Sequence, residues 1–436
     1  MGTMRTKSLC SFENRKYKGW QAIYLNNGIV TLAVVPDIGG RVIAYNLGNY
    51  PFFFVDSELA GKLFSYEENL GDGTMAAWKN YGGDKTWPAP QGWNNECQWH
   101  GPPDPVLDSG RYQVKQVKRF DNAVQVQMVS PPDLRTSIQI TRQITLLQQG
   151  SRVILDLSFT NISKRQICWS IWNVTQLRAE RLHLDGSLGP ETECVVTAPL
   201  NSRSRFPKGF NVMDGDKNNP QWGIDNQNKL FVGKYMWEIG KVGIDSPKGW
   251  IAFTNCAQGY AFATQFTYFP EKEYPDQGAT IECWTTGRGT VANLNYENNP
   301  IYLMEIEVLS PLYTFRPGET RSFQITWGSC RCEGMVVDVN KAGCIHQPLK
   351  ATPTSDGLFL SGSFGVFSCG VLQLVWQDQQ GNPLGVEVLQ EVSPLESVKL
   401  EQCFQPPPRA ARVELQLLSN GNNSLQTLAK NTFLGS

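Results

Sequence analysis

The sequence predicts an all-β protein, with a large part made of at least two packed sheet layers and a small β-sandwich after it. Three observations predict this. Apolar residues recur at every second position in many segments, which is typical of strands that bury one face. No long segment combines a helical period with helix caps. The 40 glycines and 26 prolines are spread as turn punctuation between the alternating segments.

The first elements form a hairpin. Residues 20–25 and 29–35 are strand-like, and Asn27-Gly28 between them supplies the positive φ that tight turns require. Further on, residues 137–146 alternate isoleucine with glutamine or threonine, and residues 153–159 repeat the pattern. We therefore expect antiparallel sheets with one apolar face each.

The C-terminal part begins after a change in composition. Residues 347–356 (QPLKATPTSD) are rich in Pro, Ser and Thr, which favours a linker. We divide the chain into a sheet domain at 1–345 and a small accessory β-sandwich at 346–436. The strands expected in the sandwich are 358–364, 371–377, 386–392, 398–404 and 413–418.

Charge and composition exclude several classes of protein. The chain of 436 residues carries 39 Lys+Arg against 40 Asp+Glu, so it offers no basic surface for nucleic acid. No apolar stretch approaches the roughly 18 residues of a membrane span, and no secretory signal is recognisable. The 11 cysteines are scattered singly, which favours reduced thiols in the cytoplasm. We expect no nucleic-acid or membrane partner and no cofactor.

The most distinctive segment is residues 81–93 (YGGDKTWPAPQGW), with its continuation to Gly110. It is too rich in Gly and Pro for regular structure, which predicts a functional loop. Tryptophan rings offer flat apolar faces for sugar C–H groups, and polar side chains bind hydroxyls. The alternative is a loop whose tryptophans only cap the core. The candidate binding residues are Asp84, Lys85, Trp87, Trp93 and Trp99.

These motifs resemble those of the galactose mutarotase-like (aldose epimerase) superfamily. Residues 28–42 are similar to its first strands, and the Gly82-Gly83 to Trp87-Pro88 segment is similar to a loop of its hexose-phosphate epimerase branch. The YGGDKTWPAPQ string as a whole resembles one particular branch of the superfamily. Residues 305–311 and 316–319 are similar to its closing strand and turn. Over about residues 18–330, the resemblance implies a β-supersandwich of two large curved sheets, with a sugar site in the concave face.

The resemblance also implies a chemistry. In mutarotation, a base takes the proton of the anomeric hydroxyl while an acid protonates the ring oxygen. The family uses His and Glu, so we expect His100 as the acid and Glu282 as the base, with Glu305 and Glu307 as competitors for the base. Glu282 lies in a largely apolar strand, where burial raises a carboxyl pKa. Arg41 is expected to hold a hydroxyl or phosphate, unless it forms a structural ion pair.

Metal sites are weaker hypotheses, and we expect none. Cys330-x-Cys332 with Cys344-x-His346 lacks the usual zinc spacing, and Asp214-x-Asp216-x-Asn218 lacks the turn glycine of a calcium loop. Asp104 and Asp108 lie in turn contexts and offer a weak case for glycoside hydrolysis. The expected function is binding of a carbohydrate or sugar phosphate with His/Glu anomer interconversion. The alternative is a non-catalytic carbohydrate-binding module with an accessory domain.

Overall fold

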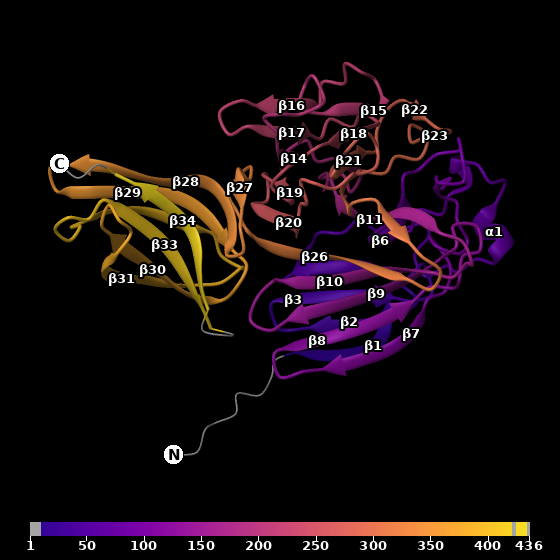
Figure 1. Cartoon of the computed structure of the whole chain (residues 1–436), viewed down its shortest axis with the longest axis horizontal. Coiled ribbons are helices and arrows are strands. Elements are labelled where there is room, and N and C mark those ends of the chain that lie inside the picture. Colours follow the sequence, from indigo (N-terminus) through magenta and orange to yellow (C-terminus); the bar gives the residue numbers. More distant parts are fainter. Residues whose placement is uncertain (1–9, 421–423, 434–436) are drawn as a thin grey trace, which may run out of the picture.

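The computed structural model describes residues 10–420 and 424–433, and nearly all of their regular structure is β-strand (Figure 1). The predicted all-β fold is confirmed. Helices in this part of the chain are limited to α1 (Tyr66–Leu70) and a 3₁₀ turn at Met75–Ala77. Among the described residues, no helix has both the length and the apolar character needed to cross a bilayer.

Two large antiparallel sheets form the main body. In the described chain one sheet has twelve strands: β1 (Ser11–Tyr17), β2 (Trp20–Asn26), β3 (Val30–Val35), β4 (Arg41–Leu47), β6 (Asp84–Ala89), β11 (Ile167–Arg178), β24 (Leu303–Leu309), β21 (Ile281–Thr285), β18 (Gly240–Ile244) and β15 (Asn211–Gly215) in spatial order, with β5 (Tyr50–Pro51) beside β4 and β25 (Tyr313–Phe315) beside β11. The other has ten: β16 (Trp222–Asp225), β17 (Leu230–Lys234), β14 (Cys194–Pro199), β19 (Trp250–Asn255), β20 (Tyr260–Phe266), β26 (Thr320–Arg331), β10 (Val153–Asn161), β9 (Ile138–Leu147), β8 (Ala123–Val129) and β7 (Gln113–Arg119). Two short hairpins, β12 (Glu180–Leu182) with β13 (Leu188–Pro190) and β22 (Thr290–Val291) with β23 (Leu294–Asn295), extend the loops.

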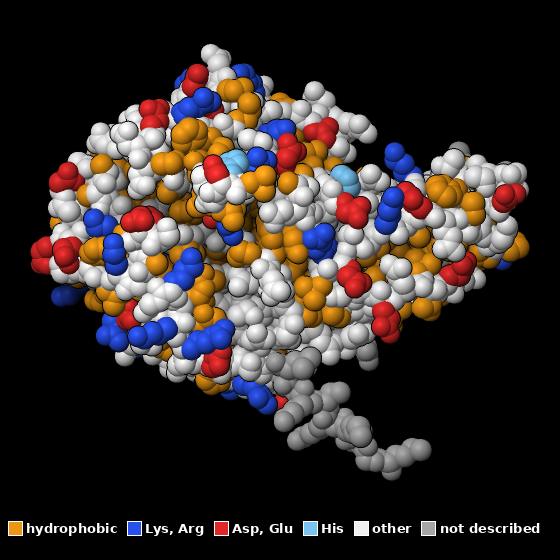
Figure 2. All heavy atoms as spheres, turned by 180° about the vertical axis from the view of Figure 1, so that it is seen from behind, with side chains coloured by type: hydrophobic (Ala, Val, Ile, Leu, Met, Phe, Trp, Pro, Cys, Tyr) orange, Lys and Arg blue, Asp and Glu red, His pale blue; other side chains and the backbone are white. Residues whose placement is uncertain are grey.

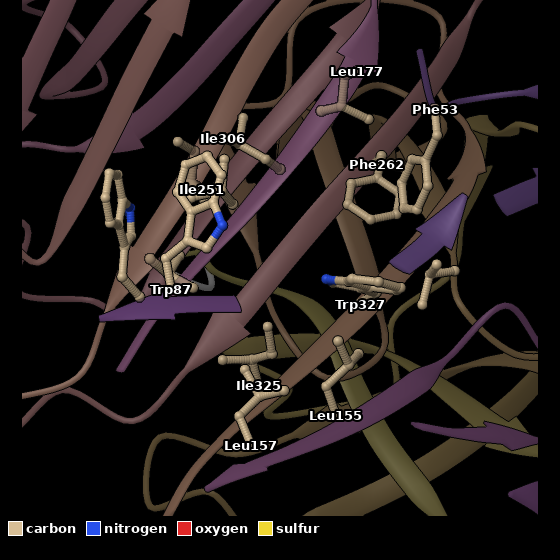
Figure 3. Close-up of a cluster of buried hydrophobic side chains, with 14 of the residues drawn as sticks. Phe53, Trp87, Leu155, Leu157, Leu177, Ile251, Phe262, Ile306, Ile325 and Trp327 are labelled. Atoms are coloured by element: carbon tan, nitrogen blue, oxygen red, sulfur yellow. The ribbon is translucent and has the colours of Figure 1, made fainter. Parts of the chain in front are cut away.

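The core lies between the two large sheets. Burial alternates strictly along β9 and β10, as the two-residue period predicts. Figure 3 shows the cluster that results, in which Phe53, Phe262 and Trp327 pack edge to face beside Leu155. The expected first hairpin is also confirmed, because β2 pairs with β3 around a turn at Gly28, whose φ is 86°.

The C-terminal residues form the predicted small sandwich. Two four-stranded sheets, drawn in orange to yellow in Figure 1, face each other around an apolar cluster that includes Phe364, Leu374, Trp376 and Leu415. One sheet contains β27 (Asp338–Val339), β28 (Gly343–Thr354), β29 (Gly357–Val366) and β32 (Val398–Phe404), and the other contains β31 (Pro383–Val392), β30 (Gly370–Gln377), β33 (Arg412–Ser419) and β34 (Leu425–Thr432).

The expected linker at 347–356 is wrong, since most of it belongs to β28, which pairs with β29 along its length. On the side away from β29, β28 pairs with β27 only near Cys344 and Ile345. The prolines of β28 come after this point, where that side of the strand forms no ladder, so they are tolerated. The register with β29 also shifts around Gln347. The domain division after residue 345 remains a prediction, and it falls inside β28.

Charges of both signs are interspersed over the face shown in Figure 2, as the balanced composition leads one to expect. The candidate functional site is a cavity lined by polar and aromatic side chains.

Candidate functional site

A cavity of about 250 Å³ lies over one face of the twelve-stranded sheet. Its walls come from β6, β11, β24, β21, β18 and β15 and from the loops after β6 and before β21. Five tryptophans line it, together with four carboxyl groups and one lysine: Trp78, Trp87, Trp93, Trp172, Trp284, Asp214, Asp276, Glu282, Glu305 and Lys241.

Strand register explains why these side chains meet. Directly opposite residues of antiparallel strands project to the same face, as do residues two apart on one strand. The opposing pairs run across the sheet from Trp87–Trp172 to Gln176–Glu305, Glu305–Trp284, Glu282–Glu307, Trp284–Lys241 and Lys241–Asp214. Each pair shares a residue with the next or is separated from it by two or four residues along one strand, so the whole set lies on one face.

The segment expected to be an irregular loop contributes a central strand, β6, so that part of the prediction is wrong. β6 pairs with β11 along its length, but with β4 only at Asp84. At Pro88 the β4 side of β6 is therefore an open edge, where a residue without a backbone N–H is tolerated. Gly82, before the strand, has φ 95°, and a Cβ there would lie 2.2 Å from the carbonyl oxygen of Phe54. Glycine is therefore required for this close approach.

Two buried lysines tie the carboxyl groups together. Lys241 Nζ lies 2.7 Å from Glu282 Oε2 and 3.2 Å from Glu307 Oε2, and it sits 4.3 Å from the ring centre of Trp172. Lys85 Nζ lies 2.9 Å from Glu305 Oε1 and 4.8 Å from the ring centre of Trp87. Each ammonium is therefore held by a carboxylate and by a tryptophan face.

Burial dominates the electrostatics of the cluster. Glu282 is 1% exposed and Glu307 is fully buried. Loss of hydration raises the pKa of Glu282 to about 7, although Lys241 acts in the opposite direction. It raises the pKa of Glu307 to about 8. Burial alone would lower the pKa of Lys241, but the charges of these two glutamates raise it above its usual value.

Asp276 adds a second carboxyl beside Glu282. Burial raises its pKa as well, and a hydrogen bond with Asp276 contributes to the raised pKa of Glu282. Such a bond requires one of them to carry a proton. Asp276 also has a positive φ of 50°, which is uncommon outside glycine. The pair can therefore hold a proton next to the cavity.

The structure places the sequence-predicted residues in two groups. Glu282, Trp87 and Trp93 line the cavity, and so does Glu305, one of the competing bases. Lys85 lies behind Trp87. Arg41 is buried one layer further back, where it forms an ion pair with Asp108. The other oxygen of Asp108 accepts a hydrogen bond from Trp78 Nε1 at 2.9 Å, so Arg41 reaches the cavity wall only through this carboxylate.

Trp99 is also buried behind the wall. Its ring centre lies 5.1 Å from that of Trp87, and its Nε1 donates to Asp104 at 2.8 Å. Of the expected binding residues, Arg41 and Trp99 therefore do not line the cavity, and Arg41 forms the ion pair that was its alternative. Both Asp104 and Asp108 are engaged in internal ion pairs.

Asp84 points away from the cavity. Neighbouring residues of a strand face opposite sides, so Asp84 enters the space between the sheets while Lys85 faces the site. There Asp84 forms a fully buried ion pair with Arg142 of β9 and accepts hydrogen bonds from Asn173 and Thr175. These contacts indicate a structural role for Asp84 between the two sheets.

His100 is not among the residues that line the cavity. Its ring stacks on Trp93, and its Nε2 lies 2.5 Å from Arg135 Nη1. Burial and the Arg135 charge lower the pKa of His100, which favours the neutral ring. The expected His/Glu pair across the cavity is not formed in this arrangement.

Sequence reasoning missed Lys241, Asp276, Trp172 and Trp284. One local signal was available, because Trp284 lies two residues after Glu282 and must share its face. Lys241 and Trp172 carry no local signal, since they reach the site only through pairing across four strands.

The residues of the two metal hypotheses lie in different places. Asp214, from the calcium-loop hypothesis, lies on β15 at the cavity. His346, from the zinc hypothesis, has its Nδ1 2.9 Å from the carbonyl oxygen of Met335. Within the described residues, no group of three or more His, Cys, Asp and Glu is arranged to hold a metal.

Comparison with known proteins completes the description. A family described as "Domain of unknown function (DUF4380)" matches residues 20–329. A candidate aldose 1-epimerase from Klebsiella pneumoniae is similar at 12% identity and a TM-score of 0.51, covering 73% of this chain and 82% of that one. A galactose mutarotase-like protein from Clostridium acetobutylicum is 11% identical with a TM-score of 0.45, covering 75% and 99%. A search of curated proteins gives no match. At these identities the similarity shows the fold, which is galactose mutarotase-like.

Proposed function

Because the chain belongs to the family described as "Domain of unknown function (DUF4380)", we propose its function from the cavity itself: it binds a carbohydrate there and transfers protons to and from the bound sugar. One observation carries the proposal. Five tryptophans and a carboxyl pair that can hold one proton converge on a single cavity.

The cavity suits a sugar in size and lining. Its volume of about 250 Å³ is just below the roughly 300–1,000 Å³ of ligand pockets, which favours a monosaccharide over a longer chain. Tryptophan faces contact sugar C–H groups, and carboxylates accept hydrogen bonds from hydroxyls. Two lining groups lack a partner among the described residues: Trp87 Nε1, a donor, and Glu282 Oε1, an acceptor. A polyhydroxylated ligand would satisfy both.

The carboxyl pair suits anomer interconversion. With one proton between them, the ionised carboxylate of the pair would take the proton of the anomeric hydroxyl, and the protonated carboxyl would give its proton to the ring oxygen. The bond between the anomeric carbon and the ring oxygen breaks, a carbonyl forms, and reclosure after rotation returns both protons. A pKa near 7 suits a group that exchanges protons at neutral pH. The carboxyl pair keeps Glu282 from the expected His/Glu pair and replaces His100 with Asp276.

Polarimetry and saturation-transfer NMR on freshly dissolved aldoses test the proposal. We expect wild type to accelerate mutarotation, and Glu282→Gln and Asp276→Asn each to lower the rate by about 10²–10⁴-fold, the range for general acid–base catalysis. Glu96→Gln, at an exposed carboxylate that does not line the cavity, is the matched control and should be unaffected. Wild type that leaves the uncatalysed rate unchanged would rule out the catalytic part.

A second candidate is carbohydrate binding without turnover. One observation favours it: Lys241 holds Glu282 Oε2 at 2.7 Å and so competes with a sugar for a carboxyl group of the proposed pair. Binding measured by NMR or calorimetry with no acceleration of mutarotation would select this candidate. A tenfold or larger acceleration that Glu282→Gln abolishes would exclude it.

A further inference from the structure

The cavity has more acidic groups than basic ones. Of the described side chains that line it, four are carboxyl groups and one is an amine. Including the two residues directly behind the wall, Glu307 and Lys85, the count is five acids against two lysines. A proton shared by Asp276 and Glu282 and a second on Glu307 still leave an acid in excess. No described arginine or histidine lines the cavity.

The same wall already binds ammonium groups in a recurring way. Lys241 and Lys85 each lie over a tryptophan ring, at 4.3 and 4.8 Å from its centre, and each contacts a glutamate within 3 Å. A tryptophan face with a carboxylate is a general arrangement for amine recognition. Two of the lining tryptophans, Trp93 and Trp284, face no ammonium group of the described residues on the cavity side, and further carboxylates lie there with them.

One buried acceptor faces the cavity without a donor. Glu282 is 1% exposed; its Oε2 is taken by Lys241, while its Oε1 has no donor among the described residues. The neighbouring acid, Asp276, can satisfy that oxygen only by carrying a proton. A cationic ligand beside these carboxyl groups would donate to this oxygen from the cavity side, and the pair would keep its proton.

We propose that the preferred ligand is an amino sugar whose protonated amine is bound between Glu282, Asp276 and the tryptophan walls. This inference rests on the proposed carbohydrate binding and names its substrate class. The same charge excess disfavours sugar phosphates, because a phosphate would meet carboxylates rather than the arginines or lysines that normally bind it. The phosphate option left open by the sequence is therefore the weaker one.

The test compares sugars of one skeleton. Glucosamine, N-acetylglucosamine, glucose and glucose 6-phosphate are titrated into the full-length protein by calorimetry at about pH 6.5, and galactose analogues are run in parallel. We expect the amino sugar to bind about 10- to 100-fold tighter than its N-acetyl form, the ratio that one hydrogen bond to a charged group contributes. Raised salt should reduce the preference.

Two variants complete the test. Glu282→Gln should abolish the preference for the amine; because this residue is buried, its fold is checked by circular dichroism. Asp214→Asn changes an exposed residue at the rim and should reduce the preference severalfold without affecting folding. If the N-acetyl sugar, glucose or the phosphate binds as tightly as the amino sugar, this inference is wrong and the proposed function stands. If no sugar binds, both are wrong.

Discussion

Substitution of Glu307 by Gln should change how stability depends on pH. Glu307 is fully buried at the base of the cavity wall, where its Oε2 accepts hydrogen bonds from Trp172 Nε1 at 2.8 Å and from Lys241 at 3.2 Å. Its pKa rises from the usual 4.5 to about 8. Folded protein therefore binds this proton more tightly than unfolded protein. The resulting stabilisation is fully present below about pH 4.5 and is lost as the pH rises through 8.

The size of the effect follows from the pKa. One pKa unit corresponds to about 1.4 kcal/mol, so between about pH 6 and pH 9 the Glu307 contribution to the free energy of unfolding should fall by up to about 3 kcal/mol. Glutamine has the shape of the protonated acid and does not titrate, so the variant should lack this loss. Relative to wild type, Glu307→Gln should gain about 2–3 kcal/mol of stability from pH 6 to pH 9.

Urea unfolding followed by tryptophan fluorescence measures this difference at each pH. Glu401→Gln, at an exposed carboxylate of β32, is the matched control and should follow the wild-type curve at every pH. Parallel curves for wild type and Glu307→Gln would refute the reasoning, because they would mean that Glu307 is ionised throughout this range.

Three further predictions concern residues that the sequence singled out. Asp84→Asn, which removes one partner of the buried pair with Arg142, should destabilise the protein by about 3–5 kcal/mol in thermal or urea unfolding; an unchanged midpoint would contradict the structural role. His100→Asn should leave sugar affinity and any mutarotation rate within about twofold, since the ring is outside the cavity lining; a rate loss of 100-fold or more would restore it as the acid. Trp93→Ala should weaken sugar binding by about 5- to 10-fold in NMR titrations with little change in melting temperature, because Trp93 is 73% exposed at the rim; unchanged affinity would exclude it from the binding site.

The sequence by itself determined the fold class, because strand periodicity is a local property. Burial in β9 and β10 follows the alternation of apolar with polar residues, and Asn27-Gly28 marks the turn of the first hairpin. Local composition was misleading where proline entered a strand. Pro88 in β6 and the prolines of β28 lie where a neighbouring ladder is absent, and this depends on the partners of those strands.

The site was predicted only in part, for the same reason. The two-residue period divides Glu305 and Glu307 from Ile306 and Val308, but it does not say whether the polar face meets water or a closed cavity. The structure shows the cavity, and both glutamates are buried there rather than at the surface. Glu282 was predicted from the sequence because a carboxyl group within a largely apolar strand is unusual, whichever strands pair with it.

What only the tertiary structure decided is which distant residues share that face. Lys241 meets Glu282 and Glu307 because β18, β21 and β24 pair in one register, and a shift by one residue would turn each of these side chains to the opposite face. Asp84 and Arg41 were expected at the site from their neighbours in sequence, yet they form internal ion pairs with Arg142 and Asp108. Register and layer packing are long-range properties, so a single sequence specifies the strands more clearly than the chemistry they assemble.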